Sequence, residues 1–135
     1  MHNTDLFKNK KKELVNGYAE TKFVKSYVFF PKNVNECIEI IENCKKKNLK
    51  ICSRGSGLSY GDIITNNENV LLDFTLMNKI ISWNSKSGII ILQPGTTFAQ
   101  VFNFSLIDNW TLSACPGSFD ITIGGAVSNN VHGKD

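Results

Sequence analysis

The feature that most constrains the fold is a pattern of strand, helix and strand that leads directly into a glycine-rich loop. Residues 23–30 read FVKSYVFF, a β-branched and aromatic run that predicts a strand, and Pro31 ends it. Residues 33–48 predict a helix and residues 49–53 a second strand, which runs into the loop RGSGLSYGD. Because a crossover of this length joins parallel strands, we expect a right-handed β-α-β unit.

The predicted helix carries a start signal and an apolar stripe. Asn33 is a capping residue, and Glu36, three positions later, completes a capping box. The face expected to pack on the core consists of Val34, Cys37, Ile38, Ile41 and Cys44.

The remaining segments complete an expected α+β (α/β) protein of two small lobes. A third strand at residues 69–74 belongs to the first lobe, about residues 17–75, which contains the parallel unit. The second lobe, about residues 76–135, is expected to hold a mixed or antiparallel sheet with helices. Residues 1–16 are expected to form a basic leader with one short helix.

Within the second lobe, residues 79–83 and 88–94 predict an antiparallel hairpin, and residues 96–109 predict a helix capped by Thr96 or Thr97.

Composition excludes several functions. A net charge of +3 is well short of the basic extreme of nucleic-acid-binding proteins, so no nucleic-acid partner is expected. No run of about 18 apolar residues predicts a membrane span, and the polar N-terminus lacks a signal peptide, so we expect a cytoplasmic protein. Four cysteines without a C-x-x-C pair and two histidines predict no metal site.

The glycine-rich loop has three interpretations. The letters GLSYG match the serine nucleophile elbow, with Ser59 followed by Asp108 or Asp120 and then His132, but no helix is predicted after the serine. The spacing also fails the dinucleotide and P-loop patterns. Two interpretations stay open: a mobile turn, and a loop whose backbone amides converge on a phosphate, with Arg54 as a charge at its mouth.

A second glycine-rich segment, PGSFDITIGGAVSNNVHGKD, ends the sequence. Thr122 is expected to cap a short helix whose N–H end faces outward, and the small residues allow a flat ligand to approach the backbone. A tight helix–helix contact at Gly124 and Gly125 is the alternative. One extended ligand between the lobes would explain both glycine-rich segments.

These residues resemble a known family. The loop RGSGLSYGD, the segment QPGTTFAQV and the final PGSFDITIGGAVSNNVHGKD are similar to the first part of the FAD-binding domain of vanillyl-alcohol oxidase type (PCMH-type) flavoproteins. The nearest branch is the decaprenylphosphoryl-ribose 2′-oxidase group with the sugar and aldonolactone oxidases. The resemblance runs from about Gly17 to Asp135 and implies an FAD extended between the lobes.

The resemblance also implies site residues. The pyrophosphate would lie on the first loop, and the phosphate, ribityl and ring regions on the second segment. The substrate-facing candidates are Tyr60, His132 and Lys134, although His132 could instead hydrogen-bond a backbone carbonyl. The implied cofactor-binding residues are Ser53, Arg54, Gly55, Ser56, Gly57, Leu58, Ser59, Tyr60, Gly61, Asp62, Ile63, Gly117, Thr122, Ile123, Gly124, Gly125, Asn129, Asn130, Val131 and His132.

The implied activity is oxidation of a CH–OH group of a sugar or polyol, including polyprenyl-phosphate-linked ones, by hydride transfer to the flavin. An aldonolactone, hydroxy acid or simple alcohol substrate is the alternative, as is a non-catalytic nucleotide-binding lobe. Many relatives carry a flavin-linked histidine where this sequence has Leu58, and a second attachment where it has Ser118 and Phe119, so a noncovalent FAD is expected.

The family's domain continues beyond this length. The chain is therefore expected to be the amino-terminal portion of a flavoenzyme, inactive alone. Its substrate domain, which would take a small-molecule substrate, is absent. A lipid-linked substrate would bring peripheral membrane association, and nothing in the sequence indicates an oligomeric state.

Overall fold

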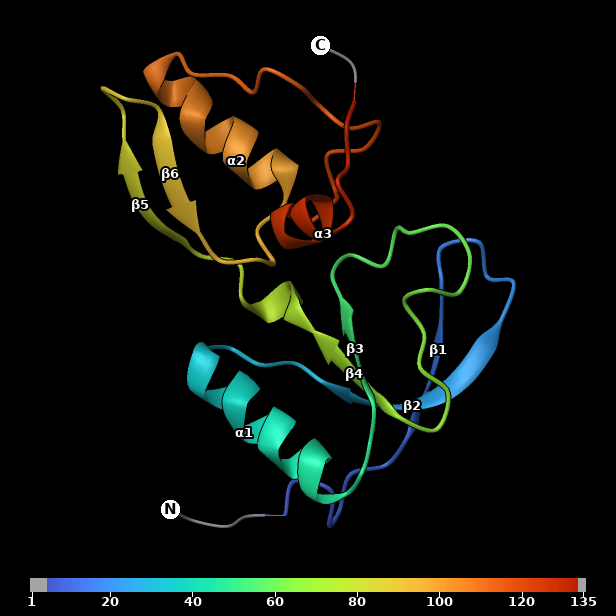
Figure 1. Ribbon diagram of the computed structural model, residues 1–135. Coiled ribbons are helices and arrows are strands. Elements are labelled where there is room, and N and C mark those ends of the chain that lie inside the picture. Colours follow the sequence, from blue (N-terminus) through green and yellow to red (C-terminus); the bar gives the residue numbers. More distant parts are fainter. Residues whose placement is uncertain (1–4, 134–135) are drawn as a thin grey trace.

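The computed structural model describes residues 5–133 and has two lobes (Figure 1). The first lobe contains a four-stranded sheet in the order β1-β2-β4-β3. Its strands are β1 (Glu13–Asn16), β2 (Phe23–Phe29), β3 (Ile51–Arg54) and β4 (Val70–Asp73). Helix α1 (Val34–Lys46) connects β2 to β3, and both of these strands pair with β4 in parallel. The parallel β-α-β unit is confirmed, with β4 between its two strands.

Helix α1 begins at the expected cap but buries a different face. The backbone N–H of Glu36 donates to Asn33 Oδ1 at 3.0 Å. Its buried residues are Ile40, Asn43 and Cys44. The expected apolar stripe is wrong in its first two turns, because Val34, Ile38 and Ile41 are exposed at 63%, 52% and 41%.

Asn43 is buried because the N-terminal segment covers it: Asn43 Oδ1 accepts from the backbone N–H of Leu6 at 3.4 Å, and Asn43 Nδ2 donates to the Glu39 carbonyl at 3.0 Å. Beside it, Ile40 and Cys44 pack with Val70 and Leu72 of the central strand. The core face of α1 is therefore the one that packs on the central strand, and the N-terminal segment covers Asn43 next to it.

The short helix expected within residues 1–16 is wrong for the described part, residues 5–16. Strand β1 pairs antiparallel with β2 in this segment. Upstream of it, the Phe7 ring packs edge-on against Tyr27 and Phe29, with ring centroids 5.1 and 5.2 Å apart. Residues 5–16 therefore form a turn, from which Phe7 packs on side chains of β2, followed by the edge strand β1.

The second lobe contains a two-stranded antiparallel sheet and two helices, in agreement with the expected hairpin. Its elements are β5 (Ile80–Asn84), β6 (Ile89–Leu92), α2 (Phe98–Ser105) and α3 (Ile123–Ser128). Thr97 caps α2 and forms a reciprocal capping box with Gln100, which decides between the two expected caps. Two short 3-10 turns follow β4 and α2, at Phe74–Leu76 and Leu106–Asp108.

Two tryptophans join the hairpin to the segment after α2. Trp83 Nε1 donates to the Asp108 carboxylate at 2.7 Å, and Trp110 Nε1 donates to the Ser85 carbonyl at 2.7 Å. Their rings also meet edge to face, with centroids 6.3 Å apart.

Among the described residues, no helix combines the length and apolar character that crossing a bilayer requires.

Candidate functional site: a cleft between the glycine loop and α3

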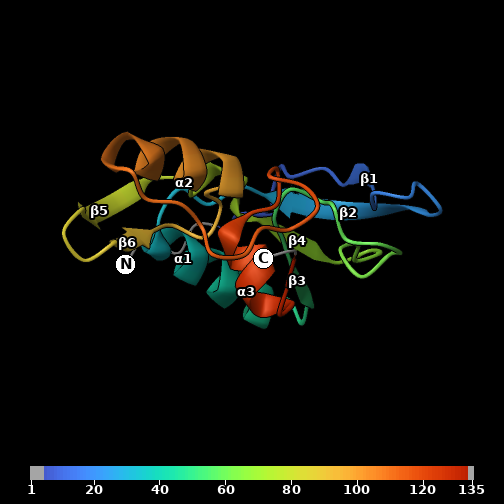
Figure 2. The same cartoon turned by 90° about the horizontal axis from the view of Figure 1, so that it is seen from above.

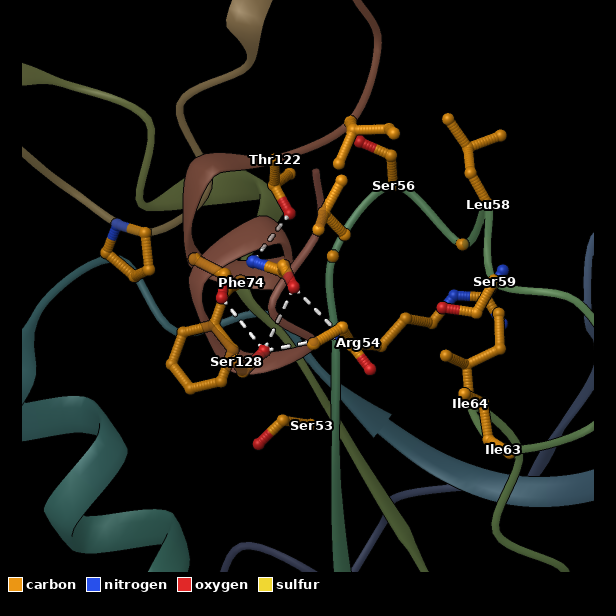
Figure 3. Close-up of a pocket in the computed structure, with 18 of the residues that line it drawn as sticks. Ser53, Arg54, Ser56, Leu58, Ser59, Ile63, Ile64, Phe74, Thr122 and Ser128 are labelled. Atoms are coloured by element: carbon orange, nitrogen blue, oxygen red, sulfur yellow. Dashed lines mark hydrogen bonds between the residues drawn. The ribbon is translucent and has the colours of Figure 1, made fainter. Parts of the chain in front are cut away.

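A cleft of about 640 Å³ lies where the two lobes meet. One side is the glycine loop, here residues 55–63, which continues from β3, and the other side is α3 with its flanking residues. Figure 3 shows Ser56, Leu58 and Ser59 on the loop and Thr122 and Ser128 at α3. The cleft is lined by Ser53, Arg54, Gly55, Ser56, Gly57, Leu58, Ser59, Tyr60, Ile63, Ile64, Phe74, Pro94, Ile121, Thr122, Gly124, Gly125, Ser128, Asn129 and Val131.

The backbone of the glycine loop requires glycine at two positions. Gly57 has φ 76° and Gly61 has φ 72°, in the left-handed region that side chains disfavour. The loop is fixed to both lobes: Ser56 Oγ donates to the Asp120 carbonyl at 2.5 Å, and Cys52 Sγ of β3 donates to the Ile63 carbonyl at 3.4 Å. Burial raises the pKa of the Cys52 thiol, so it keeps the proton that it donates.

The backbone N–H groups within and just after this loop lack hydrogen-bond acceptors in the described part of the protein. Within the described part of the chain, none of the nine N–H groups of residues 56–64 donates to a protein oxygen. These residues include most of the loop side of the cleft. A run of amides without protein partners, at glycines with left-handed conformations, can bind an anion.

Arg54, which was expected at the mouth of the loop, lines the cleft, but its guanidinium is held by two partners in the first lobe. Its Nη1 donates to the Asn16 carbonyl at 2.8 Å, and its Nε lies 3.8 Å from the Asp73 carboxylate. Both side chains of this ion pair are mostly buried, and Nη2 would lie 2.6 Å from a Cβ built on Gly57. The guanidinium thus supports the loop from behind. Its carboxylate partner comes from β4, whose end lies beside the end of β3.

The N–H groups at the start of α3 are already used, so the outward-facing helix end expected from the sequence is wrong. Ile123 N–H donates to the Thr96 carbonyl at 2.7 Å and Gly124 N–H to the Pro94 carbonyl at 2.8 Å. Thr122 caps the helix as predicted, since its Oγ1 accepts from Gly125 N–H at 3.3 Å. An anion is therefore bound better by the glycine loop than by α3.

A side chain at either glycine of α3 would meet a different neighbour. A Cβ on Gly124 would lie 2.6 Å from Pro94 Cβ, so this glycine allows α3 to pack on the loop after β6. The contact is with a loop and not with a second helix. At Gly125 a Cβ would meet the Thr122 hydroxyl at 2.9 Å.

Most, but not all, of the residues expected at the site line the cleft. Those expected from the sequence that do not line it are Gly61, Asp62, Gly117, Ile123, Asn130 and His132. Of the three substrate-facing candidates, Tyr60 lines the cleft, and Lys134 lies outside the described residues. His132 is exposed, and its Nδ1 lies 3.3 Å from the Asn130 carbonyl, as the alternative for this residue anticipated.

Five residues line the cleft without having been among the expected site residues; of these, Pro94, Ile121 and Ser128 lie in segments that carry the family resemblance, and Ile64 and Phe74 do not. Four of them are apolar residues indistinguishable from core residues in a sequence. The hydrolase interpretation is excluded as expected, because residues 55–69 contain no helix to support Ser59. Among the described residues, no group of three or more His, Cys, Asp or Glu side chains could hold a metal ion.

Comparison with known proteins matches residues 25–135 to a family described as FAD binding domain. A decaprenylphosphoryl-β-D-ribose oxidase of Mycolicibacterium smegmatis is 29% identical over 63% of this chain and 18% of its own length. A mitochondrial D-2-hydroxyglutarate dehydrogenase of Arabidopsis thaliana is 29% identical over 78% of this chain and 19% of its own.

Among solved structures, a cholesterol oxidase of Brevibacterium sterolicum has a TM-score of 0.78 at 17% identity, covering 90% of this chain and 24% of that one. That similarity shows a shared fold. The chain spans about a fifth of the length of these curated relatives.

Proposed function

The chain belongs to the FAD-binding domain family, and we propose that it forms the part of a flavin-dependent oxidoreductase that holds the FAD pyrophosphate in the cleft between its lobes. The observation that carries the proposal is that residues 56–60, 63 and 64, whose backbone N–H groups have no protein acceptor within the described part of the chain, line a cleft of about 640 Å³ opposite α3. This volume falls within the range of roughly 300–1,000 Å³ that is typical of ligand pockets.

The residues present fit a dinucleotide phosphate. Hydrogen bonds from backbone amides to a charged oxygen contribute about 1.5–3 kcal/mol each, so three or four of them would hold a pyrophosphate firmly. Arg54, whose guanidinium lies against Gly57, supports this part of the loop while it stays paired with Asp73. The expected contacts of Gly61, Asp62, Gly117, Ile123, Asn130 and His132 remain proposals that the described cleft does not favour.

The chain's own residues would bind and orient the cofactor and exclude water from it. The apolar residues of the cleft, Leu58, Ile63, Ile64, Phe74, Pro94, Ile121 and Val131, would cover its uncharged parts. Bound FAD supplies hydride acceptance from a CH–OH carbon. Tyr60 lies at the cleft, 82% exposed, where it could contact a substrate.

We propose a noncovalent FAD because Leu58, whose side chain is aliphatic, lines the cleft and offers no nucleophile for attachment. The proposed substrate is a small molecule with a CH–OH group on a sugar or polyol, including polyprenyl-phosphate-linked sugars. Similarity to the ribose oxidase supports this class. Similarity to the hydroxyglutarate dehydrogenase supports a hydroxy acid as the second candidate. The protein is proposed to act in the cytoplasm.

The experiment is to express the protein with every residue that its gene encodes and record its absorption spectrum. We expect a flavin spectrum, directly or after addition of FAD, and its absence in both cases would contradict the proposal. Acid precipitation should release all of the flavin to the supernatant, whereas colour kept in the pellet would show a covalent bond. Reduction of the bound flavin by sugars and polyols, but not by hydroxy acids, would decide between the two substrate classes.

A further inference from the structure

The last residue of β1 and the turn that joins it to β2, residues 16–22 and together called the hairpin turn, lie beside the glycine loop in both views of the molecule (Figures 1 and 2). The hairpin turn is internally fixed. The backbone N–H of Glu20 donates to the Gly17 carbonyl at 3.0 Å, and Glu20 adopts φ 52°. It is followed by β2, the strand that pairs with the central strand β4.

The backbones of the two segments touch. Gly17 is buried, and a Cβ built on it would overlap the carbonyl oxygen of Gly61. Only a residue without a side chain allows this approach. The hairpin turn therefore sets how far the far end of the glycine loop can move toward the first sheet.

The hairpin turn also holds the arginine behind the loop. Asn16, the last residue of β1, accepts a hydrogen bond from Arg54 Nη1 at 2.8 Å through its backbone carbonyl. The same guanidinium fills the space on the side of Gly57 where a Cβ would be. Through Arg54, the Asn16 carbonyl therefore helps to hold the first half of the loop in place.

Two side-chain contacts complete the interface. The rings of Tyr18 and Tyr60 meet edge to face, with centroids 6.1 Å apart and planes at 83°. Lys22 Nζ lies 3.2 Å from Asp62 Oδ2. Tyr60 is 82% exposed, so its contact with Tyr18 restrains a ring that little else covers.

We propose that the hairpin turn positions the glycine loop for anion binding, with Tyr18 and Lys22 as positioning residues. The amides of residues 56–64 have no protein acceptor in the described chain, so the shape of the loop depends on its other contacts, and those with the hairpin turn are made at Tyr60, Gly61 and Asp62. Holding a loop in its bound shape reduces the entropy lost on binding and so raises affinity. The proposal rests on the proposed function, because the anion is the FAD pyrophosphate.

The test compares FAD dissociation constants, measured by flavin fluorescence, for the whole protein and its variants. Tyr18→Ala should raise the dissociation constant about 3- to 10-fold, which corresponds to loss of one aromatic pair. Tyr18→Phe keeps the ring and should stay within about 2-fold of the unaltered protein. Lys22→Glu, at an exposed position that folding tolerates, should weaken binding about 2- to 5-fold by repelling Asp62. Leu14→Ala, an exposed apolar residue of the same hairpin, is the control and should bind normally.

The proposal would be overturned if Tyr18→Ala, Tyr18→Phe and Lys22→Glu all bound FAD as tightly as the unaltered protein. In that case the proposed function would still hold, because the unaltered protein binds FAD. If the unaltered protein binds no FAD, the proposed function fails, and chymotrypsin cleavage after Leu58 or Tyr60 tests the hairpin turn by itself. Cleavage several-fold faster in Tyr18→Ala than in Tyr18→Phe supports a positioning role, and equal rates refute it.

Discussion

Gly55 of the glycine loop lies directly against the side chain of Thr122, at the start of α3. A Cβ built on Gly55 would overlap the Thr122 hydroxyl and lie 3.2 Å from Thr122 Cβ. Thr122 is 3% exposed and held by the cap of α3 and by an isolated bridge to Thr97. The lobes therefore meet at a point where the loop has no room for a side chain, and the width of the cleft is fixed there.

Gly55→Ala should separate the lobes at this contact. Because Thr122 cannot move without losing its cap, we expect a loss of about 1–3 kcal/mol in the free energy of unfolding, as for other overpacked sites. The FAD dissociation constant should rise about tenfold or more. Urea denaturation and flavin titration measure the two effects.

The matched control for Gly55 is Gly117→Ala, because a Cβ on Gly117 meets nothing within 4 Å and this residue does not line the cleft. The free energy of unfolding should be unchanged in that variant. A Gly55→Ala protein as stable as the Gly117→Ala protein would show that the lobes are not in close contact at Thr122.

Gly57→Ala and Gly61→Ala should differ in cost although both glycines have positive φ. Each substitution places a side chain in the left-handed region, which costs about 1–2 kcal/mol. At Gly61 the added Cβ points into open space, whereas at Gly57 it meets Arg54 Nη2 at 2.6 Å. Arg54 is held by Asp73 and the Asn16 carbonyl, so it cannot simply turn away.

We therefore expect Gly57→Ala to be more destabilising than Gly61→Ala by about 1 kcal/mol or more in urea denaturation. Adding Arg54→Ala to each variant identifies the cause: the difference between the two glycines should then largely disappear. A difference that persists without the arginine would mean that the backbone alone sets it.

The parts of the site that could be predicted from the sequence are those with local causes. The helix cap Thr122 depends on neighbouring residues, and it was predicted. Arg54 depends on Asp73, 19 residues later, and on a carbonyl of β1, so its position behind the loop was not predictable from its own surroundings.

The same distinction holds for the fold. The β-α-β unit follows from long periodic segments, whereas β1 is four residues long and lies in a lysine-rich segment. Strand β1 is ordered by its pairing with β2, and no local sequence pattern predicts this pairing. Leu6 and Phe7 of the same N-terminal segment pack against the buried residues of α1 and β4, a contact that the sequence pattern of α1 does not reveal.

The cap of α2 offers a test of the second lobe. Thr97 Oγ1 accepts from Gln100 N–H at 3.3 Å, while the Gln100 side chain accepts from Thr97 N–H at 2.9 Å. Thr97→Ala should lower the free energy of unfolding by about 1 kcal/mol, and Thr97→Ser, which keeps the hydroxyl, should stay within a few tenths. Thermal denaturation followed by circular dichroism measures both. If the serine variant loses as much as the alanine variant, the methyl group and not the cap is responsible.

The buried thiol of Cys44 makes stability depend on pH. Burial raises the pKa of this thiol above its usual 9.0, and the residue is 1% exposed, packed with Ile40, Val70 and Leu72. A group whose pKa is higher in the folded state stabilises that state fully below the unfolded pKa and loses the contribution as the pH rises. Unfolding free energy should therefore fall as the pH rises through about 9 toward 10. Burial also raises the pKa of Cys37 and Cys52, which adds to the fall in the same direction.

Cys44→Ala and Cys44→Val both remove the ionisable group, so each should show a smaller fall in unfolding free energy relative to its own value at neutral pH. The two variants differ in side-chain volume and hence in baseline stability, but should agree in this slope, because the slope depends only on the protons bound by the folded and unfolded states. Urea denaturation at several pH values measures it. A slope unchanged in both variants would show that the thiol of Cys44 does not titrate differently in the two states, and that the alkaline loss of stability comes from other groups.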